Sequence, residues 1–160
     1  MAPESVYVGL GANLGAARDT LTRALKQLGE LPSTRVVEVS SFYATAPVDA
    51  QGPNYINAVA ELSTELQPRE LLQALQSIEL QHGRERPYHH APRTLDLDLL
   101  LYGERLITEP GLDVPHPRLH RRAFVLEPLL EIAPGLQHPA LGPLAAWRAR
   151  ITDQATLKLP

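Results

Sequence analysis

The sequence predicts an α+β protein in which two helices pack on one face of an antiparallel sheet. Segments that alternate apolar and other residues, as strands do, flank two segments whose apolar residues recur at helical spacing. Their order along the chain is strand, helix, strand, strand, helix, strand. A chain of 160 residues with 44% hydrophobic residues can bury one core, so we expect a single domain over residues 1–160.

The first half of this pattern reaches the middle of the chain. Residues 5–10 alternate and predict a strand, and the glycines of residues 11–15 predict a tight turn into a helix that ends at Gly29. These glycines match neither the dinucleotide-binding pattern nor a P-loop. Two more strands are predicted over residues 35–43 and 55–66. The loop between them contains Pro and Gly and is too long for a tight hairpin, which suits contact with a ligand.

The second half repeats the helix and the strand. A helix is predicted from Pro68 to Gly83, and a leucine-rich strand over residues 94–102. This order of elements is that of a ferredoxin-like fold, whose helices cover one face of the sheet and leave the other face free. We predict three elements in a C-terminal extension: a short strand at 106–107, a helix at 120–126 that Pro128 stops, and a last helix at 144–151.

Asp96 and Asp98 are acidic residues inside the leucine-rich strand. Because side chains alternate along a strand, both carboxylates lie on one face, about 6.5 Å apart. Carboxylates at this spacing can hold Mg²⁺, whereas two like charges on a strand otherwise need a compensating positive charge. The wet face of an antiparallel sheet is the ordinary alternative, but the pair favours a functional site.

A loop with three arginines, Arg84, Arg86 and Arg93, directly precedes this strand. Guanidinium groups match phosphate oxygens bidentately. Carboxylates that hold Mg²⁺ beside arginines that hold phosphate are the working parts of phosphoryl transfer. We therefore predict that this loop is mobile and belongs to an anion site.

Composition excludes some classes of protein. The absence of cysteine rules out a disulfide framework and thiol catalysis. A net charge of −3 argues against a general nucleic-acid binder. However, the chain has thirteen arginines, and seven of them lie between residues 84 and 122, so a local anion site is still expected. The sequence shows no signal peptide and no run near the roughly 18 apolar residues of a membrane span. We expect a cytoplasmic protein with no nucleic-acid or membrane partner.

Residues 89–100, His-His-Ala-Pro-Arg-Thr-Leu-Asp-Leu-Asp-Leu-Leu, resemble the signature of the 6-hydroxymethyl-7,8-dihydropterin pyrophosphokinase family. That folate-pathway family moves pyrophosphate from ATP to a pterin alcohol. Its motif Pro-Arg-x-x-Asp-x-Asp followed by aliphatic residues is long and specific. The resemblance spans nearly the whole chain in order, since it also covers residues 9–15, 40–47, 55–58, 78–86 and 114–124.

The resemblance implies a catalytic centre and two substrate sites. The hydroxymethyl oxygen would attack the β-phosphorus of ATP in line and release AMP, with two Mg²⁺ ions held by Asp96 and Asp98. The implied catalytic residues are Arg84, Arg93, Asp96 and Asp98. Those implied for the pterin are Thr45, Ala46, Val48, Tyr55, Asn57 and Phe124. Those implied for the nucleotide are Gln76, Glu79, Arg86, Leu99, His116 and Arg122.

Ordinary structural interpretations exist for part of this set. Without the resemblance Phe124 would be a core residue and Tyr55 a strand aromatic, and His116 between two prolines suits a turn cap. Gln76, Glu79 and Arg122 suit exposed helix faces. The chain departs from the family at five positions that bear on loop closure and adenosine binding: His90, Ala91, Gly111, Asp113 and Pro117.

Two other functions are open to this sequence. One is a non-enzymatic ferredoxin-like module that binds a metal ion or a small regulator through the Asp pair. The other is RNA binding on the free sheet face. That function requires aromatic residues on the central strands, and aromatic residues make up only 5% of this sequence. Neither function uses the arginines together with the aspartates. We expect a monomer that acts on small molecules, with the next folate-pathway enzyme as a candidate partner.

Overall fold

The computed structural model of the protein describes residues 2–12, 16–45, 55–83 and 95–160. The strands are β1 (Glu4–Ala12), β2 (Thr34–Val39), β3 (Tyr43–Thr45), β4 (Tyr55–Thr64), β5 (Asp96–Tyr102), β6 (Ile107–Glu109), β7 (Leu112–Val114), β8 (Gln137–His138), β9 (Gly142–Pro143) and β10 (Leu157–Lys158). The helices are α1 (Ala17–Gly29), α2 (Pro68–Gly83), the 3₁₀ turn η1 (Leu119–Arg121), α3 (Ala123–Ile132) and α4 (Leu144–Arg150).

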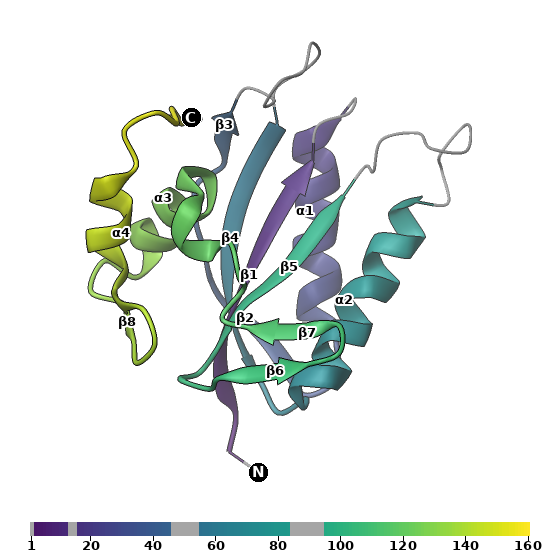
Figure 1. The fold of residues 1–160 in the computed structure, drawn as a ribbon. Helices are drawn as coiled ribbons and strands as arrows, with labels where there is room; N and C mark the ends of the chain where they lie inside the picture. The colour runs from purple at the N-terminus through teal and green to yellow at the C-terminus, as the bar shows by residue number, and fades with distance from the viewer. Residues whose placement is uncertain (1, 13–15, 46–54, 84–94) are drawn as a thin grey trace.

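The main sheet is antiparallel and has the strand order β10-β3-β4-β1-β5, with β2 also paired to β4. Helices α1 and α2 lie together on one face of it, while α3 and α4 lie on the other side (Figure 1). The order β1, α1, β2 and β3, β4, α2, β5 confirms the predicted ferredoxin-like α+β fold. The short hairpins β6-β7 and β8-β9 and the last helix belong to the C-terminal extension.

The core between the sheet and helices α1 and α2 follows from alternation along the strands. On β4 the side chains of Ile56, Ala58 and Ala60 pack toward these helices, as do Val6 and Val8 of β1. The helices contribute leucines at helical spacing, each buried at a gain of about 2 kcal/mol. The opposite residues of the same strands are therefore available on the other face.

That other face is not free along its whole length, contrary to the prediction. A second apolar cluster joins Val59 of β4 and Leu101 of β5 to Leu126 and Leu129 of α3 and to Leu144 of α4. Helix α3 thus covers one end of the face, because its own apolar side chains require burial. The other end holds the polar residues described below.

A bulge in β5 corrects the predicted side-chain directions. Tyr7 pairs with Leu101 and Val8 pairs with Leu99, so Leu100 is an extra residue in the strand. Leu101 therefore joins Leu100 on the α3 side, although strict alternation predicts it among the leucines of the helix side. The carbonyl of Leu100 accepts a hydrogen bond from the backbone N–H of His116 at 2.9 Å.

Element boundaries differ from the prediction in three places. The strand predicted at 35–43 is divided into β2 and β3, and at the break the hydroxyl of Ser40 accepts a hydrogen bond from the N–H of Val59 at 3.0 Å. The first strand continues through Ala12 instead of turning at residue 11. Pro128 lies inside α3 and does not stop it. Burial of the apolar residues of α3 offsets the cost of an interior proline, about 3 kcal/mol.

Candidate active site

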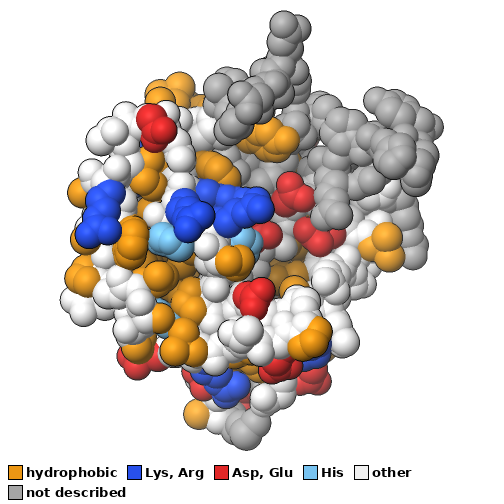
Figure 2. Space-filling view, viewed as in Figure 1, with side chains coloured by type: hydrophobic (Ala, Val, Ile, Leu, Met, Phe, Trp, Pro, Cys, Tyr) orange, Lys and Arg blue, Asp and Glu red, His pale blue; other side chains and the backbone are white. Residues whose placement is uncertain are grey.

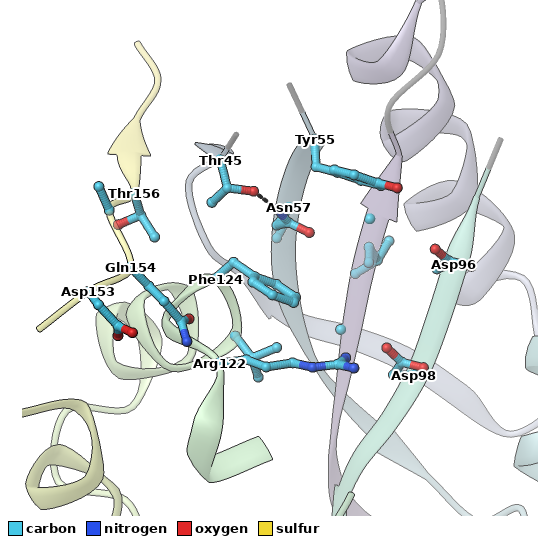
Figure 3. Close-up of a pocket in the computed structure, with 16 residues that line it drawn as sticks. Thr45, Tyr55, Asn57, Asp96, Asp98, Arg122, Phe124, Asp153, Gln154 and Thr156 are labelled. Carbon is cyan, nitrogen blue, oxygen red and sulfur yellow. Dashed lines mark hydrogen bonds between the residues drawn. The ribbon is translucent and has the colours of Figure 1, made fainter. Parts of the chain in front are cut away.

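A cavity of about 780 Å³ lies on the uncovered end of the sheet face opposite α1 and α2. Strands β1, β4 and β5 form its floor, and the start of α3 and the segment before β10 form one side (Figure 3). The labelled side chains that line it are Thr45, Tyr55, Asn57, Asp96, Asp98, Arg122, Phe124, Asp153, Gln154 and Thr156.

The floor of the cavity is formed by a row of paired residues that lie side by side on the three neighbouring strands β4, β1 and β5. Gly11 of β1 pairs with Asn57 of β4 on one side and with Asp96 of β5 on the other. One step further, Gly9 pairs with Asp98. The strands of Asn57 and of the aspartates are thus separated by β1, and its glycines leave bare backbone between the amide and the carboxylates.

Asn57 is held rigidly at one end of this row. Its side-chain amide donates a hydrogen bond to the hydroxyl of Thr45 at 3.1 Å, and only 6% of the residue is exposed. A Cβ added at Gly11 would lie 3.0 Å from Oδ1 of Asn57, closer than nearly all real contacts. A side chain at position 11 would therefore press on the amide of Asn57 and displace it by a few tenths of an ångström. The fixed amide can read the hydrogen-bonding edge of a planar ligand.

Aromatic side chains lie on either side of the amide. The ring of Tyr55 extends over the cavity from the start of β4, and the ring of Phe124 lies between Asn57 and Arg122 (Figure 3). The guanidinium carbon of Arg122 is 5.4 Å from the centre of the Phe124 ring. These rings offer stacking surfaces to a flat heterocycle. Phe124 is also partly buried against the second apolar cluster, so it contributes to the core as well as to the cavity.

The acidic end of the cavity receives its compensating charge from Arg122. Asp96 and Asp98 face the cavity from β5, and the side chain of Arg122 reaches toward them (Figure 3). Burial lowers the pKa of Arg122, whereas Asp98 raises it, and guanidinium stays charged at neutral pH even so. Basic side chains on this face lie next to acidic ones near its centre (Figure 2).

His116 lies beside the same carboxylates. Its Nε2 is 3.9 Å from Oδ1 of Asp98, and its Nδ1 accepts a hydrogen bond from the backbone N–H of Arg118 at 3.1 Å. The neutral ring therefore carries its proton on Nε2, toward Asp98. Burial lowers the pKa of His116 and Arg122 adds to this, against the opposing effect of Asp98. His116 thus caps a turn, as one interpretation predicted, and also faces the acidic pair.

Three other described residues predicted for the nucleotide, Gln76, Glu79 and Leu99, lie off the lining of the cavity. Glu79 of α2 accepts a hydrogen bond from the backbone N–H of Leu97 at 2.8 Å, between the two aspartates in sequence. Gln76 is exposed on α2. The side chain of Leu99 is 5% exposed and packs in the core on the helix side of the sheet.

Seven of the named positions lie outside the described residues. These are Arg84, Arg86 and Arg93 of the arginine loop, its two departures His90 and Ala91, and Ala46 and Val48 before β4. The structure therefore brings together the pterin-directed residues Thr45, Tyr55, Asn57 and Phe124 with Asp96, Asp98, Arg122 and His116.

Sequence reasoning missed the glycine floor and the C-terminal wall. Gly9 was placed in the predicted strand and Gly11 in the turn after it, yet both alternate with Val8 and Leu10 and so face the cavity. That alternation was a usable signal. The segment Asp153–Thr156 carried no comparable signal, because its position depends on the pairing of β10 with β3.

Within residues 2–12, 16–45, 55–83 and 95–160, no group of three or more His, Asp or Glu side chains is arranged to hold a metal ion. In the same parts, none of the helices has the length and apolar character needed to cross a membrane.

Comparisons with known proteins identify the family of this chain. The family model described as 7,8-dihydro-6-hydroxymethylpterin-pyrophosphokinase (HPPK) matches residues 7–134. A 2-amino-4-hydroxy-6-hydroxymethyldihydropteridine pyrophosphokinase of Pseudomonas aeruginosa is 49% identical over 137 residues, 85% of each chain. The protein of that name in Haemophilus influenzae is 42% identical over 156 residues, 97% of this chain and 98% of the relative.

A solved structure supports the fold. The chain matches a crystal structure of Plasmodium falciparum HPPK-DHPS with a TM-score of 0.75 over 92% of its length, at 12% identity. It spans 45% of that longer chain. The family model and the relatives define the class as transferases that move a diphosphate group. The chain belongs to the 7,8-dihydro-6-hydroxymethylpterin-pyrophosphokinase family, and it is a pyrophosphokinase of folate biosynthesis.

Proposed function

We propose that this cavity binds 6-hydroxymethyl-7,8-dihydropterin and ATP together and transfers the diphosphate to the pterin alcohol, with AMP as the other product. The single observation that carries this proposal is the row Asn57, Gly11, Asp96, because it joins an amide reader to a carboxylate pair across bare backbone. A flat heterocycle on this floor would point its substituent toward the acids.

The pterin end of the proposal rests on Asn57, Tyr55 and Phe124. The amide of Asn57 offers both a donor and an acceptor, which the amide-like edge of a pterin requires. Its hydrogen bond to Thr45 limits the rotation of the side chain. The two aromatic rings would hold the heterocycle between them, with Ala46 and Val48 as further contacts.

The phosphate end rests on Asp96, Asp98 and Arg122. Mg²⁺ is commonly held by one or two carboxylates together with phosphate oxygens and water. Asp96 and Asp98, which form no three-residue metal cluster with other acidic or histidine side chains of the described residues, fit the two ions expected here. Bound Mg²⁺ would neutralise the negative charge of the triphosphate. Arg122, which reaches toward the two aspartates (Figure 3), and His116, 3.9 Å from Asp98, would bind phosphate oxygens.

In the proposed reaction the hydroxymethyl oxygen of the pterin forms a bond to the β-phosphorus of ATP. The bond from that phosphorus to the α–β bridging oxygen breaks, and the oxygen leaves with AMP. The aspartates and Arg122 hold the reacting groups in line, which is the main requirement of phosphoryl transfer. Arg84 and Arg93 are proposed to meet the charge on the bridging oxygen, and Arg86, Gln76 and Glu79 to lie along the nucleotide.

An assay of nucleotide products tests this function. Purified protein with ATP, Mg²⁺ and the pterin alcohol should release one AMP for each pterin diphosphate formed, and Asp98→Asn should abolish this release. Release of ADP, or of AMP without the pterin, would contradict the proposal. Binding of Mg²⁺ without turnover would favour the regulatory module instead. A cytoplasmic location, a monomeric state and a partner enzyme of the folate pathway stay predictions of the sequence.

A further inference from the structure

We propose that Gln154 is a positioning residue that fixes the direction of Arg122 in the cavity. This inference rests on the proposed function of Arg122 as a phosphate ligand. Gln154 comes from the segment before β10, far from Arg122 in sequence, and its side chain points to the start of α3 (Figure 3). It would act through the backbone on both sides of Arg122.

Arg122 occupies the junction between η1 and α3. Its backbone is extended, with φ −121° and ψ 110°, and no side chain of its own caps the helix. The N–H of Ala123 is one of the first N–H groups of α3, which a helix leaves without an internal partner. Oε1 of Gln154 accepts a hydrogen bond from this N–H at 2.9 Å. The junction is thus held from outside the helix.

The same side chain holds the other side of the junction. Nε2 of Gln154 donates a hydrogen bond to the carbonyl of Arg121 at 3.0 Å. The two hydrogen bonds bracket Arg122 and restrain the peptide groups before and after it. They also determine the orientation of the Gln154 amide, because the N–H of Ala123 can only donate and the carbonyl of Arg121 can only accept. The arginine side chain then leaves toward Asp98 across the ring of Phe124.

Gln154 is itself anchored to the sheet. Five residues later, the N–H of Leu159 donates to the carbonyl of Phe42 at 2.8 Å, and β10 pairs with β3. Strand β3 also carries Thr45, the partner of Asn57. The segment therefore links the phosphate side of the cavity to the pterin side.

A double-mutant cycle tests the proposal. Gln154→Met keeps the length of the side chain and removes both hydrogen bonds, and Gln154→Ala is the second variant. We expect either change to weaken the affinity for a non-hydrolysable ATP analogue with Mg²⁺, and kcat/KM, about tenfold. In an Arg122→Ala background the same changes should have less than about a twofold effect, because coupled residues are not additive. Thr152→Ala, an exposed neighbour, is the matched control.

The outcomes separate this inference from the proposed function. An unchanged affinity in both Gln154 variants, or an equal loss with and without Arg122, would overturn the positioning role. Lower thermal stability with unchanged affinity would show a purely structural role and overturn it as well. If the wild type bound the analogue with this coupling but released no AMP, the proposed function would fail and the positioning role would stand.

Discussion

The sheet face opposite α1 and α2 has two ends that differ in the side chains they carry and in what covers them. At one end Val59, Leu101 and their neighbours are covered by α3 and α4. At the other end the same strands present Asn57, Asp96 and Asp98 to a cavity. One face of one sheet thus serves as a core in one half and as a binding surface in the other.

The difference teaches that side-chain type, not sheet topology, decides where such a site forms. Apolar residues on β4 and β5 require a covering helix, whereas glycines and paired carboxylates are incompatible with one. Mutations at the two ends should therefore fail in different ways. Changes at the cavity end should reduce activity and leave stability intact, and changes at the covered end should do the reverse.

The largest expected effect is at the acidic pair. Asp96→Ala or Asp98→Ala should reduce kcat by about 10³-fold or more, because each removes a ligand for the cation that meets the phosphate charge. The melting temperature should stay or rise, since like-charge repulsion is relieved. Steady-state kinetics and thermal unfolding, with exposed Glu104→Ala as control, measure this. A variant with full Mg²⁺-dependent activity would refute the metal assignment.

The opposite pattern is expected at the covered end. Leu129→Ala should lower the free energy of unfolding by about 3 kcal/mol, because the residue is fully buried between α3 and the sheet. Activity per folded molecule should be unchanged well below the melting temperature. Urea unfolding measures the loss, and Leu106→Ala, at a residue 66% exposed, is the control. A lower kcat in folded Leu129→Ala would contradict the expectation that changes at the covered end affect stability and not activity.

The glycine floor gives the sharpest test inside the cavity. Gly11→Val should raise the KM for the pterin about 10²-fold with a smaller change for ATP, because the new side chain displaces Asn57 and fills the floor. Valine suits a strand, so the fold should be retained. Gly135→Ala is the matched control, since a Cβ there meets nothing within 4 Å. An unchanged pterin KM would exclude binding on this floor.

The smallest expected effect concerns Glu131 of α3, which joins the covered end to β3. Burial raises its pKa, but hydrogen bonds from Tyr43 and Ser41 lower it by more, so the net shift is downward. A lowered pKa stabilises the fold above the ordinary pKa of glutamate, and this stability is lost as the pH falls through the folded-state pKa.

Glu131→Gln should therefore lower the free energy of unfolding by about 1 kcal/mol at pH 7. The difference from the wild type should shrink below about pH 4.5, the ordinary value. Chemical unfolding from pH 3 to pH 7 measures it, with Glu104→Gln as a surface control. A difference that stays constant down to pH 3 would argue against a lowered pKa.

Local patterns predicted most of the fold because periodicity is a local property. The alternation in β1 and β4 and the leucine spacing of α1 and α2 were enough for the helix-side core. The break between β2 and β3 was not predictable, since it depends on Ser40 bonding to a strand distant in sequence. Pro128 also misled, because burial of α3 outweighs the intrinsic preference of a proline.

The site was predictable where its residues lie together in one sequence motif, and not where packing brings together residues that are distant in sequence. Asp96 and Asp98 followed from the alternation of their strand, and Asn57 followed from the resemblance to the family. Arg122 became the counter-charge of the acids only through the packing of α3 against the sheet. Gln154 lies at the cavity because β10 returns to β3, and no spacing in the sequence encodes that contact.

The bare floor at Gly9 and Gly11 has a consequence for inhibitors. A compound that lies flat there contacts main-chain atoms, which remain the same after almost any amino-acid exchange. Escape from such a compound would need a larger side chain at one of the two glycines. At Gly11 that side chain would also disturb Asn57, so resistance at that position should come with weaker binding of the natural substrate.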